Sequence, residues 1–213
     1  MDIVCISDTH GRHKKLNVPE GDVLVCAGDI SPRGELEMVM SFLNWFEKQP
    51  HKHKVFIAGN HDWCFMNGDA CVILDEIRGM ESVHYLEDSD IELDGVKFYG
   101  TPWQPEFCNW AFNLPRGEEI LEKWKMIPED TDVLITHGPP QMVLDTVEGR
   151  HNEHLGCADL NKEISGRIRP KLHVFGHIHS GNGSETFGNT TFINASVLGE
   201  DYQLKYPAYT VTI

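Results

Sequence analysis

The sequence contains no long hydrophobic run, no Cys-x-x-Cys pair and few basic residues. No apolar stretch is long enough to cross a bilayer, and no basic segment precedes the first apolar run. We therefore expect neither a membrane-spanning helix nor a secretory signal peptide. The six cysteines, with no other sign of secretion, are expected to be reduced thiols in a cytoplasmic protein.

The shortage of basic residues gives the chain a strong negative charge. Eighteen Lys and Arg residues stand against 33 Asp and Glu, for a formal net charge of −15. Such a charge disfavours nucleic-acid polymers and anionic membranes as partners. A small phosphorylated substrate remains compatible, because bound metal ions can dominate the field at a local site.

The length and composition indicate one folded domain. The 213 residues are 40% hydrophobic and 24% charged, which suits a single globular domain over residues 1–213. Repeats and low-complexity segments are absent from the sequence.

Five short motifs follow apolar runs that have the length and β-branched content of buried strands. The runs occupy residues 3–6, 23–26, 55–57, 133–135 and 172–175. The motifs are Asp8-Thr9-His10, Gly28-Asp29, Gly59-Asn60-His61-Asp62, Thr136-His137-Gly138 and Gly176-His177-Ile178-His179. Because open α/β sheets bind ligands at the carboxyl ends of their strands, we expect the motifs to meet at one edge.

The residue types in these motifs suit two divalent cations. Two metals about 3.5–4 Å apart can clamp the attacking and leaving oxygens of a displacement at phosphorus. They require anionic oxygens, one of which can bridge, and imidazole ligands favour transition metals. The candidate ligands are Asp8, His10, Asp29, Asn60, His137, His177 and His179. Each motif alone could be an ordinary turn or a surface histidine, but five in order after five strands favour a metal site.

The ordered set resembles the calcineurin-like metallophosphoesterase superfamily, whose pattern is D-x-H, G-D, G-N-H-E/D, H and G-H-x-H. The resemblance covers essentially the whole chain. Residues 136–140, 156–157, 169–176 and 193–196 are similar to its class III cyclic-nucleotide phosphodiesterase-like branch, which includes the metallophosphoesterase-domain-containing proteins of animals. Some members of that branch lack the first histidine of G-H-x-H. His177 is present here, which implies an intact second metal site.

The resemblance also implies a fold and a role for each motif residue. The implied fold is α/β, a four-layer α-β-β-α sandwich with two mixed sheets flanked by helices. Asp29 resembles the carboxylate that bridges the metals, His61 the catalytic histidine that faces the phosphoryl group, and Asp62 the acid that orients it. The ligands of one metal correspond to Asp8, His10 and His179, and those of the other to Asn60, His137 and His177.

Periodicity predicts the remaining elements. Helices are expected over residues 35–47, 69–79, 117–126 and 159–168, and further strands over 96–99, 190–193 and 206–213.

The loop of residues 101–114 carries four aromatic residues, Trp103, Phe107, Trp110 and Phe112. These rings either form a wall on which a nucleobase or aryl group stacks, or pack onto the sheet.

Several other polar residues are expected to lie outside the site. His51 and His53 fall in a basic turn that we expect to be solvated, as is Arg12 after the first motif. His151 and His154 form a His-x-x-His pair in a loop, and the ligand positions are already filled without them.

These features predict a metal-dependent phosphodiesterase that acts on small diesters or cyclic nucleotides. Mn²⁺ is the expected ion, and Fe, Zn, Ni, Co and Mg also suit the ligands. A phosphomonoesterase is one alternative, because the metal core does not distinguish the two ester classes. The other is a scaffold that keeps the fold without turnover, but such a protein would have lost ligands that are present here.

Overall fold

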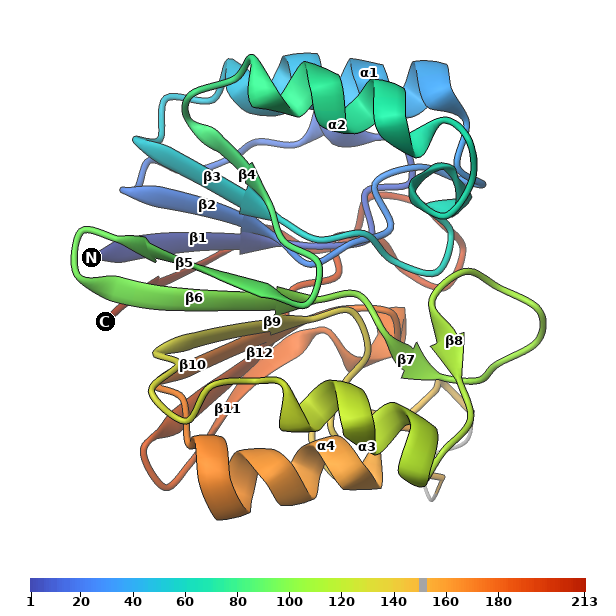
Figure 1. The fold of residues 1–213 in the computed structure, drawn as a ribbon, viewed down its shortest axis with the longest axis vertical. Coiled ribbons are helices and arrows are strands. Elements are labelled where there is room, and N and C mark those ends of the chain that lie inside the picture. The colour runs from blue at the N-terminus through green and yellow to red at the C-terminus, as the bar shows by residue number, and fades with distance from the viewer. Residues whose placement is uncertain (150–152) are drawn as a thin grey trace.

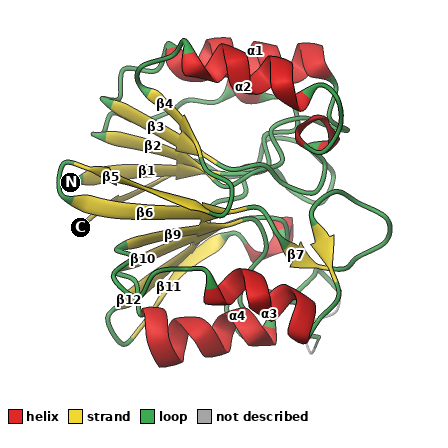
Figure 2. Ribbon diagram, in the orientation of Figure 1, coloured by secondary structure: helices red, strands yellow, loops and turns green. Residues whose placement is uncertain are grey.

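In the computed structural model, which describes residues 1–149 and 153–213, two β-sheets pack face to face (Figure 1). Each sheet carries a pair of helices on its outer surface, so the layers run helix, sheet, sheet, helix (Figure 2). The predicted four-layer sandwich is confirmed.

The first sheet has five strands. They span Asp2–Ile6 (β1), Val23–Cys26 (β2), His53–Phe56 (β3), Val83–Tyr85 (β4) and Tyr209–Thr212 (β13), in the order β13-β1-β2-β3-β4. Strands β1 to β4 are parallel, and β13 lies antiparallel beside β1. Every residue of β2 is buried, as expected for a parallel strand that is covered on both faces.

The second sheet has six strands. They span Ser89–Leu93 (β5), Val96–Thr101 (β6), Val133–Thr136 (β9), Leu172–Phe175 (β10), Gly183–Phe187 (β11) and Thr190–Asn194 (β12), in the order β11-β12-β10-β9-β6-β5. The four central strands are parallel, and the two edge strands are antiparallel to their neighbours. A ladder of Gln104–Pro105 (β7) and Asn113–Leu114 (β8) lies within the aromatic loop.

The first three helices begin and end within a residue of their predicted limits, whereas the predicted helix 159–168 is divided between an α-helix and a π-helical turn. Leu36–Glu47 (α1) and Ala70–Arg78 (α2) cover the first sheet, and Glu118–Lys125 (α3) and Ala158–Glu163 (α4) cover the second (Figure 1). Helix α4 continues as a π-helical turn over Ile164–Ile168. Short 3₁₀ turns span His13–Lys15, Trp63–Phe65 and His179–Gly181.

Three apolar layers hold the sandwich together. One lies between the first sheet and its helices, one between the two sheets, and one between the second sheet and its helices. Among the residues of 1–149 and 153–213, no helix combines the length and apolar character that a bilayer span needs.

Three strands of the two large sheets escaped the sequence prediction because they lack apolar runs, and so did the two-residue strands β7 and β8. In β5 the exposed Asp90 and Glu92 interrupt the pattern, four residues of β11 are exposed, and β4 is only three residues long. All three are edge strands, where only part of the strand needs to be apolar.

The prediction of a solvated turn at His51 was wrong. Its side chain is buried, with a relative exposure of 2%, and its ring lies against Gly21 in the loop before β2. His53 is half-buried as the first residue of β3. The segment is covered because the neighbouring loop folds over the amino end of the strand.

Candidate metal centre

The five motifs meet at the carboxyl ends of β1, β2, β3, β9 and β10, where the two sheets approach each other. A bridge between Ser7 and Ser196 joins the chain after β1 to the chain after β12, so the sheets are connected at this edge. Six of the seven predicted ligands are buried there, and His177 is half-buried.

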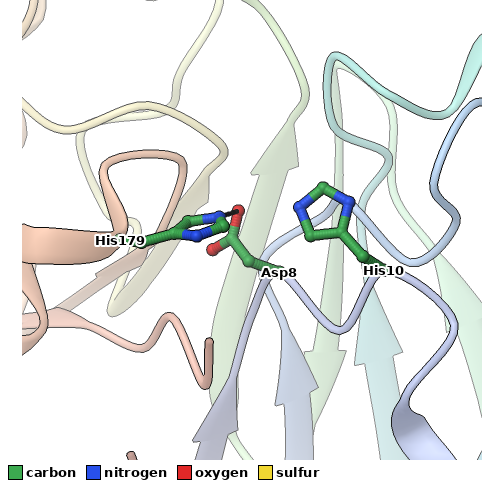
Figure 3. A group of neighbouring side chains, drawn as sticks. All are labelled: Asp8, His10 and His179. Carbon is green, nitrogen blue, oxygen red and sulfur yellow. Dashed lines mark ion pairs between the residues drawn. The ribbon is translucent and has the colours of Figure 1, made fainter. Parts of the chain in front are cut away.

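Two clusters of ligand atoms form at this edge. One contains Asp8, His10 and His179, and the other contains Asp29, His137 and His177; within each cluster the ligand atoms lie within 4.8 Å of one another. Figure 3 shows the Asp8 carboxylate and the His179 ring turned toward each other, with the His10 ring on the other side of Asp8.

Two contacts complete the arrangement. Asn60 reaches the second cluster, since its Oδ1 lies 2.9 Å from Nε2 of His137. Asp29 also lies in a group with His10 and His61. Its carboxylate therefore stands between the two clusters, as a bridging ligand would.

The local backbone turns these side chains inward. Asp8, His10, Asp29 and His177 have φ values of 56°, 39°, 52° and 69°. Non-glycine residues rarely adopt this left-handed region; Asp, Asn and His do so most readily, and residues in sparsely populated regions cluster at functional sites. Backbone hydrogen bonds hold the chain in this strained conformation, such as the 3.0 Å bond from the Asp8 N–H to the Gly28 carbonyl.

Two glycines in the motifs leave room for the carboxylates. A Cβ at Gly59 would collide with the carboxylate of Asp29, and a Cβ at Gly176 would collide with that of Asp8. The glycines of the third and fifth motifs are therefore required for close packing against the acids.

Hydrogen bonds outside the clusters orient two of the histidines. Nδ1 of His137 lies 2.9 Å from the Ala27 carbonyl, and Nδ1 of His179 lies 3.0 Å from the Gly199 carbonyl. A carbonyl can only accept, so each Nδ1 carries the hydrogen and each Nε2 points into the site. Ligand histidines in metal sites are oriented in this way.

The ring atoms and carboxylates leave a space suited to cations. The Nε2 atoms of His137 and His10 lie 3.3 and 3.6 Å from Oδ2 of Asp29, and Nε2 of His179 lies 3.5 Å from Oδ1 of Asp8. Both ring nitrogens of His10 are buried and find no hydrogen-bond partner in the described part of the chain. Buried polar atoms normally have partners, so this donor set fits divalent metal ions.

The electrostatics of the site also favour cations. Burial opposes ionisation of Asp8, but the hydrogen bond and charge of His179 hold the pKa of Asp8 well below its usual range. Burial likewise opposes ionisation of Asp29, and His137 lowers the pKa of Asp29. In return, against the effect of burial, Asp29 raises the pKa of His137 to about 9 and Asp8 raises that of His179 to about 9. The side chains alone thus attract positive charge, here as protons.

Asp62, which resembles the acid that orients His61, makes its hydrogen bonds elsewhere. Nδ1 of His61 lies 2.5 Å from the Pro32 carbonyl. The buried carboxylate of Asp62 instead accepts hydrogen bonds from the backbone N–H groups of Ile30, Ser31 and Gly59, and from the Ser31 hydroxyl. Asp62 therefore joins the second motif to the third, and it acts on His61 only through this backbone.

A cavity of about 560 Å³ opens over the metal ligands. His61 faces it, together with Phe107, Trp110, Arg116 and Tyr202. Arg116 also donates to the carbonyls of residues 155 and 156, which form part of the wall.

Tyr202 is a site residue that sequence reasoning missed. Its ring centroid lies 5.0 Å from that of His10 and 5.2 Å from that of His179, and its φ of 57° is unusual for a bulky residue. No motif surrounds it in the sequence, so only its strained backbone marks it, and that is visible only in the structure.

Of the remaining loop histidines, His154 pairs with Asp145, at 2.6 Å between Nδ1 and Oδ1, and does not line the cavity over the metal ligands. His151 lies outside the described residues.

Comparison with known proteins agrees with this geometry. The sequence profile of the family described as Calcineurin-like phosphoesterase matches residues 1–181. The chain is 40% identical to human "Metallophosphoesterase domain-containing protein 1", over 99% of this chain and 70% of that protein. It is 39% identical to "UPF0046 protein K07C11.7" of Caenorhabditis elegans, over 96% of this chain and 72% of that protein.

A solved structure confirms the fold. The structure of TT1561 of Thermus thermophilus superimposes with a TM-score of 0.60 at 14% identity, over 91% of this chain and 88% of that one. The family match and the relatives at about 40% identity together show that this chain belongs to the calcineurin-like phosphoesterase family, the metal-dependent hydrolases of phosphoesters that work with a dinuclear centre.

Proposed function

We propose that the protein is a phosphodiesterase that cleaves small diesters or cyclic nucleotides, with two divalent ions, expected to be Mn²⁺, at the clustered ligands. One ion would be held by Asp8, His10 and His179, the other by Asn60, His137 and His177, with Asp29 between them. The observation that carries this proposal is that two clusters of ligand atoms share the neighbourhood of a single carboxylate.

The cavity supports a diester more than a monoester. Beyond the metal ligands it is lined by Phe107, Val147 and Leu155, and the side chains of Phe107 and Leu155 are 58% and 38% exposed. This apolar wall offers a place for the second organic substituent of a diester, which a monoester lacks. The volume lies within the usual range of small-molecule sites.

The chemistry divides between the ions and the side chains. When bound, the ions would supply Lewis acidity at the phosphoryl oxygens. His61 faces the same cavity, and the Pro32 carbonyl occupies the side of Nδ1, which leaves Nε2 for the substrate. Because Nδ1 donates its hydrogen to that carbonyl, His61 acts as the acid in its doubly protonated form. The proton on Nε2 passes to the leaving oxygen, and the ring is left neutral.

A substrate panel tests the proposal. The purified protein is loaded with Mn²⁺ and assayed on bis-p-nitrophenyl phosphate, p-nitrophenyl phosphate, and 2′,3′- and 3′,5′-cyclic nucleotides. We expect higher kcat/KM on the diesters, loss of activity on chelation, and recovery with Mn²⁺. Higher kcat/KM on p-nitrophenyl phosphate would instead identify a phosphomonoesterase.

A matched variant separates the metal site from other histidines. His177→Ala should lose bound metal and activity together. His84→Ala changes a histidine on β4 that lies in neither cluster and should retain both. Undiminished turnover by a preparation shown by elemental analysis to be free of metal would refute the two-metal proposal.

A further inference from the structure

The aromatic loop is docked onto the motif that contains His61. The N–H of Ala111 donates to the Asn60 carbonyl at 3.1 Å, and the N–H of Phe112 contacts the sulfur of Met66 at 3.1 Å. The side chain of Gln104 ties the two arms of the loop together through the Ala111 carbonyl, at 2.9 Å. The loop is thus held at a defined position beside the metal ligands.

Within this loop, Trp110 stacks on the ring of His61. The ring centroids lie 4.2 Å apart, and the planes are inclined by 23°. At the edges of the imidazole, the Pro32 carbonyl lies 2.5 Å from Nδ1, and His10 makes an edge-on contact at 4.6 Å between centroids. The Tyr202 ring also lies 6.5 Å from it, at a tilt of 55°. The imidazole of His61 is therefore restrained by one hydrogen bond, by the rings of His10 and Tyr202, and by one stacked ring.

The other aromatic side chains of the loop have different environments. Trp103 donates to Asp88 at 3.0 Å and has the Lys123 ammonium 4.4 Å from its ring centre. Phe112 is buried, whereas Phe107 is 58% exposed and lines the cavity. Trp103 and Phe112 are packing residues, Phe107 is free to meet a substrate, and Trp110 has one face covered by His61.

We infer that Trp110 is a positioning residue for the catalytic His61, rather than a platform for the substrate. The inference rests on the proposed phosphodiesterase function. The hydrogen bond to Pro32 fixes one ring atom but allows the ring to swing about it. The flat indole prevents this swing and keeps Nε2 directed into the cavity. Proton transfer is sensitive to such alignment, and a misplacement of about 1 Å can cost about 10²-fold in rate.

A double-mutant cycle tests the coupling. Trp110→Ala and His61→Ala are made singly and together, and kcat and KM are measured on bis-p-nitrophenyl phosphate and on a diester with an alkyl leaving group. Metal content and the midpoint of thermal unfolding are recorded for each variant. Phe107 lies in the same loop and lines the same cavity. Phe107→Ala therefore shows the effect on KM of losing a side chain that contacts the substrate.

Trp110→Ala should lower kcat on the alkyl ester by about 10- to 100-fold and lower it less on the p-nitrophenyl ester, whose leaving group needs little protonation. KM and metal content should change little. In the His61→Ala background the same change should have no further effect. Trp110→Phe, which keeps a flat ring, should restore most of kcat, whereas Trp110→Leu should not. The Phe and Leu variants keep a large apolar side chain at this position and decide the matter even if the Ala variant fails to fold.

Three results would overturn the inference. Equal losses from Trp110→Ala with and without His61 would show that the two side chains act independently. A rise in KM matched by Phe107→Ala would make Trp110 part of the substrate wall. Full activity of Trp110→Leu would remove any need for the stacked ring. Failure of the Mn²⁺-loaded wild type to hydrolyse any ester would instead refute the proposed function, and the basis of this inference with it.

Discussion

Replacing Asp62 by Asn should destabilise the protein rather than act mainly on catalysis. Oδ2 of Asp62 accepts from the N–H groups of Ile30, at 3.1 Å, and Gly59, at 2.9 Å. Oδ1 accepts from the N–H of Ser31, at 2.9 Å, and from its hydroxyl, at 2.8 Å. An amide offers one oxygen and one NH₂, so it can serve either the Ser31 pair or the other two donors. Two buried donors are left facing another donor.

The magnitude follows from these four bonds. A hydrogen bond to a charged group contributes roughly 1.5–3 kcal/mol, and loss of two is partly offset because the neutral amide is easier to bury. Burial and the charge of Asp29 raise the pKa of Asp62 to about 6. The charged carboxylate is thus disfavoured at this position, which also reduces the cost of replacing it with a neutral amide. We expect Asp62→Asn to lower the free energy of unfolding by about 2–4 kcal/mol, which lowers the Tm by roughly 4–16 °C for a protein of this size.

Thermal and urea unfolding, followed by circular dichroism, would measure the change. Asp75→Asn is the matched control, because Asp75 is 71% exposed and forms a salt bridge with Arg78 one helical turn away; the control should change stability by less than about 1 kcal/mol. Below its transition the folded Asp62→Asn variant should keep more kcat than His61→Ala. An unchanged Tm, together with a loss of kcat as large as that of His61→Ala, would refute the assigned structural role and restore a direct catalytic one.

Three further predictions concern the metal ligands and the proton donor. Asp29→Asn removes the carboxylate placed between the clusters, so it should weaken the binding of both ions and lower metal content more than His177→Ala does. Two tightly held ions in the Asp29→Asn variant would contradict a bridging role. His61→Ala should keep both metals but lower kcat by roughly 10²–10⁴-fold, with the smallest loss when p-nitrophenol is the leaving group. His177→Ala should instead lose metal, and the reverse pattern would mean that the two roles are exchanged. Because the pKa values of His137 and His179 are raised to about 9, each metal displaces a proton at neutral pH. The affinity for Mn²⁺ should therefore rise about tenfold per pH unit for each proton displaced, up to about pH 9; calorimetry in buffers of different ionisation enthalpy would detect the released protons, and a pH-independent affinity would contradict the assignment.

The ligand set was predictable from the sequence for a local reason. Each ligand follows a short apolar run or falls in the motif directly after it, and parallel strands bring their carboxyl ends to one edge of a sheet. Asp8 and His137 are 129 positions apart in the chain, yet both lie just past, or at, the end of a buried strand. The helices were predictable because their buried residues recur at helical spacing, as Val39, Leu43 and Phe46 do in α1.

Contacts between motifs were decided only by the tertiary structure. The family resemblance implied that Asp62 orients His61, but the two side chains meet different partners. Asp62 reaches back about 30 residues to Ile30 and Ser31, and His61 meets Pro32 and Trp110 instead. Nothing in the local pattern specifies which distant backbone donors a buried carboxylate will satisfy.

The sequence by itself therefore determined most of the helices and strands, the chemistry of the metal ligands and the strand ends that carry them, because these depend on residue type and local periodicity; the layered arrangement followed from the family resemblance. The tertiary structure alone decided which partner each side chain meets. It brought Tyr202 over His10 and His179 and placed Trp110 on His61. Such contacts join segments that are distant in the chain, and they depend on how the loops pack once both sheets are in place.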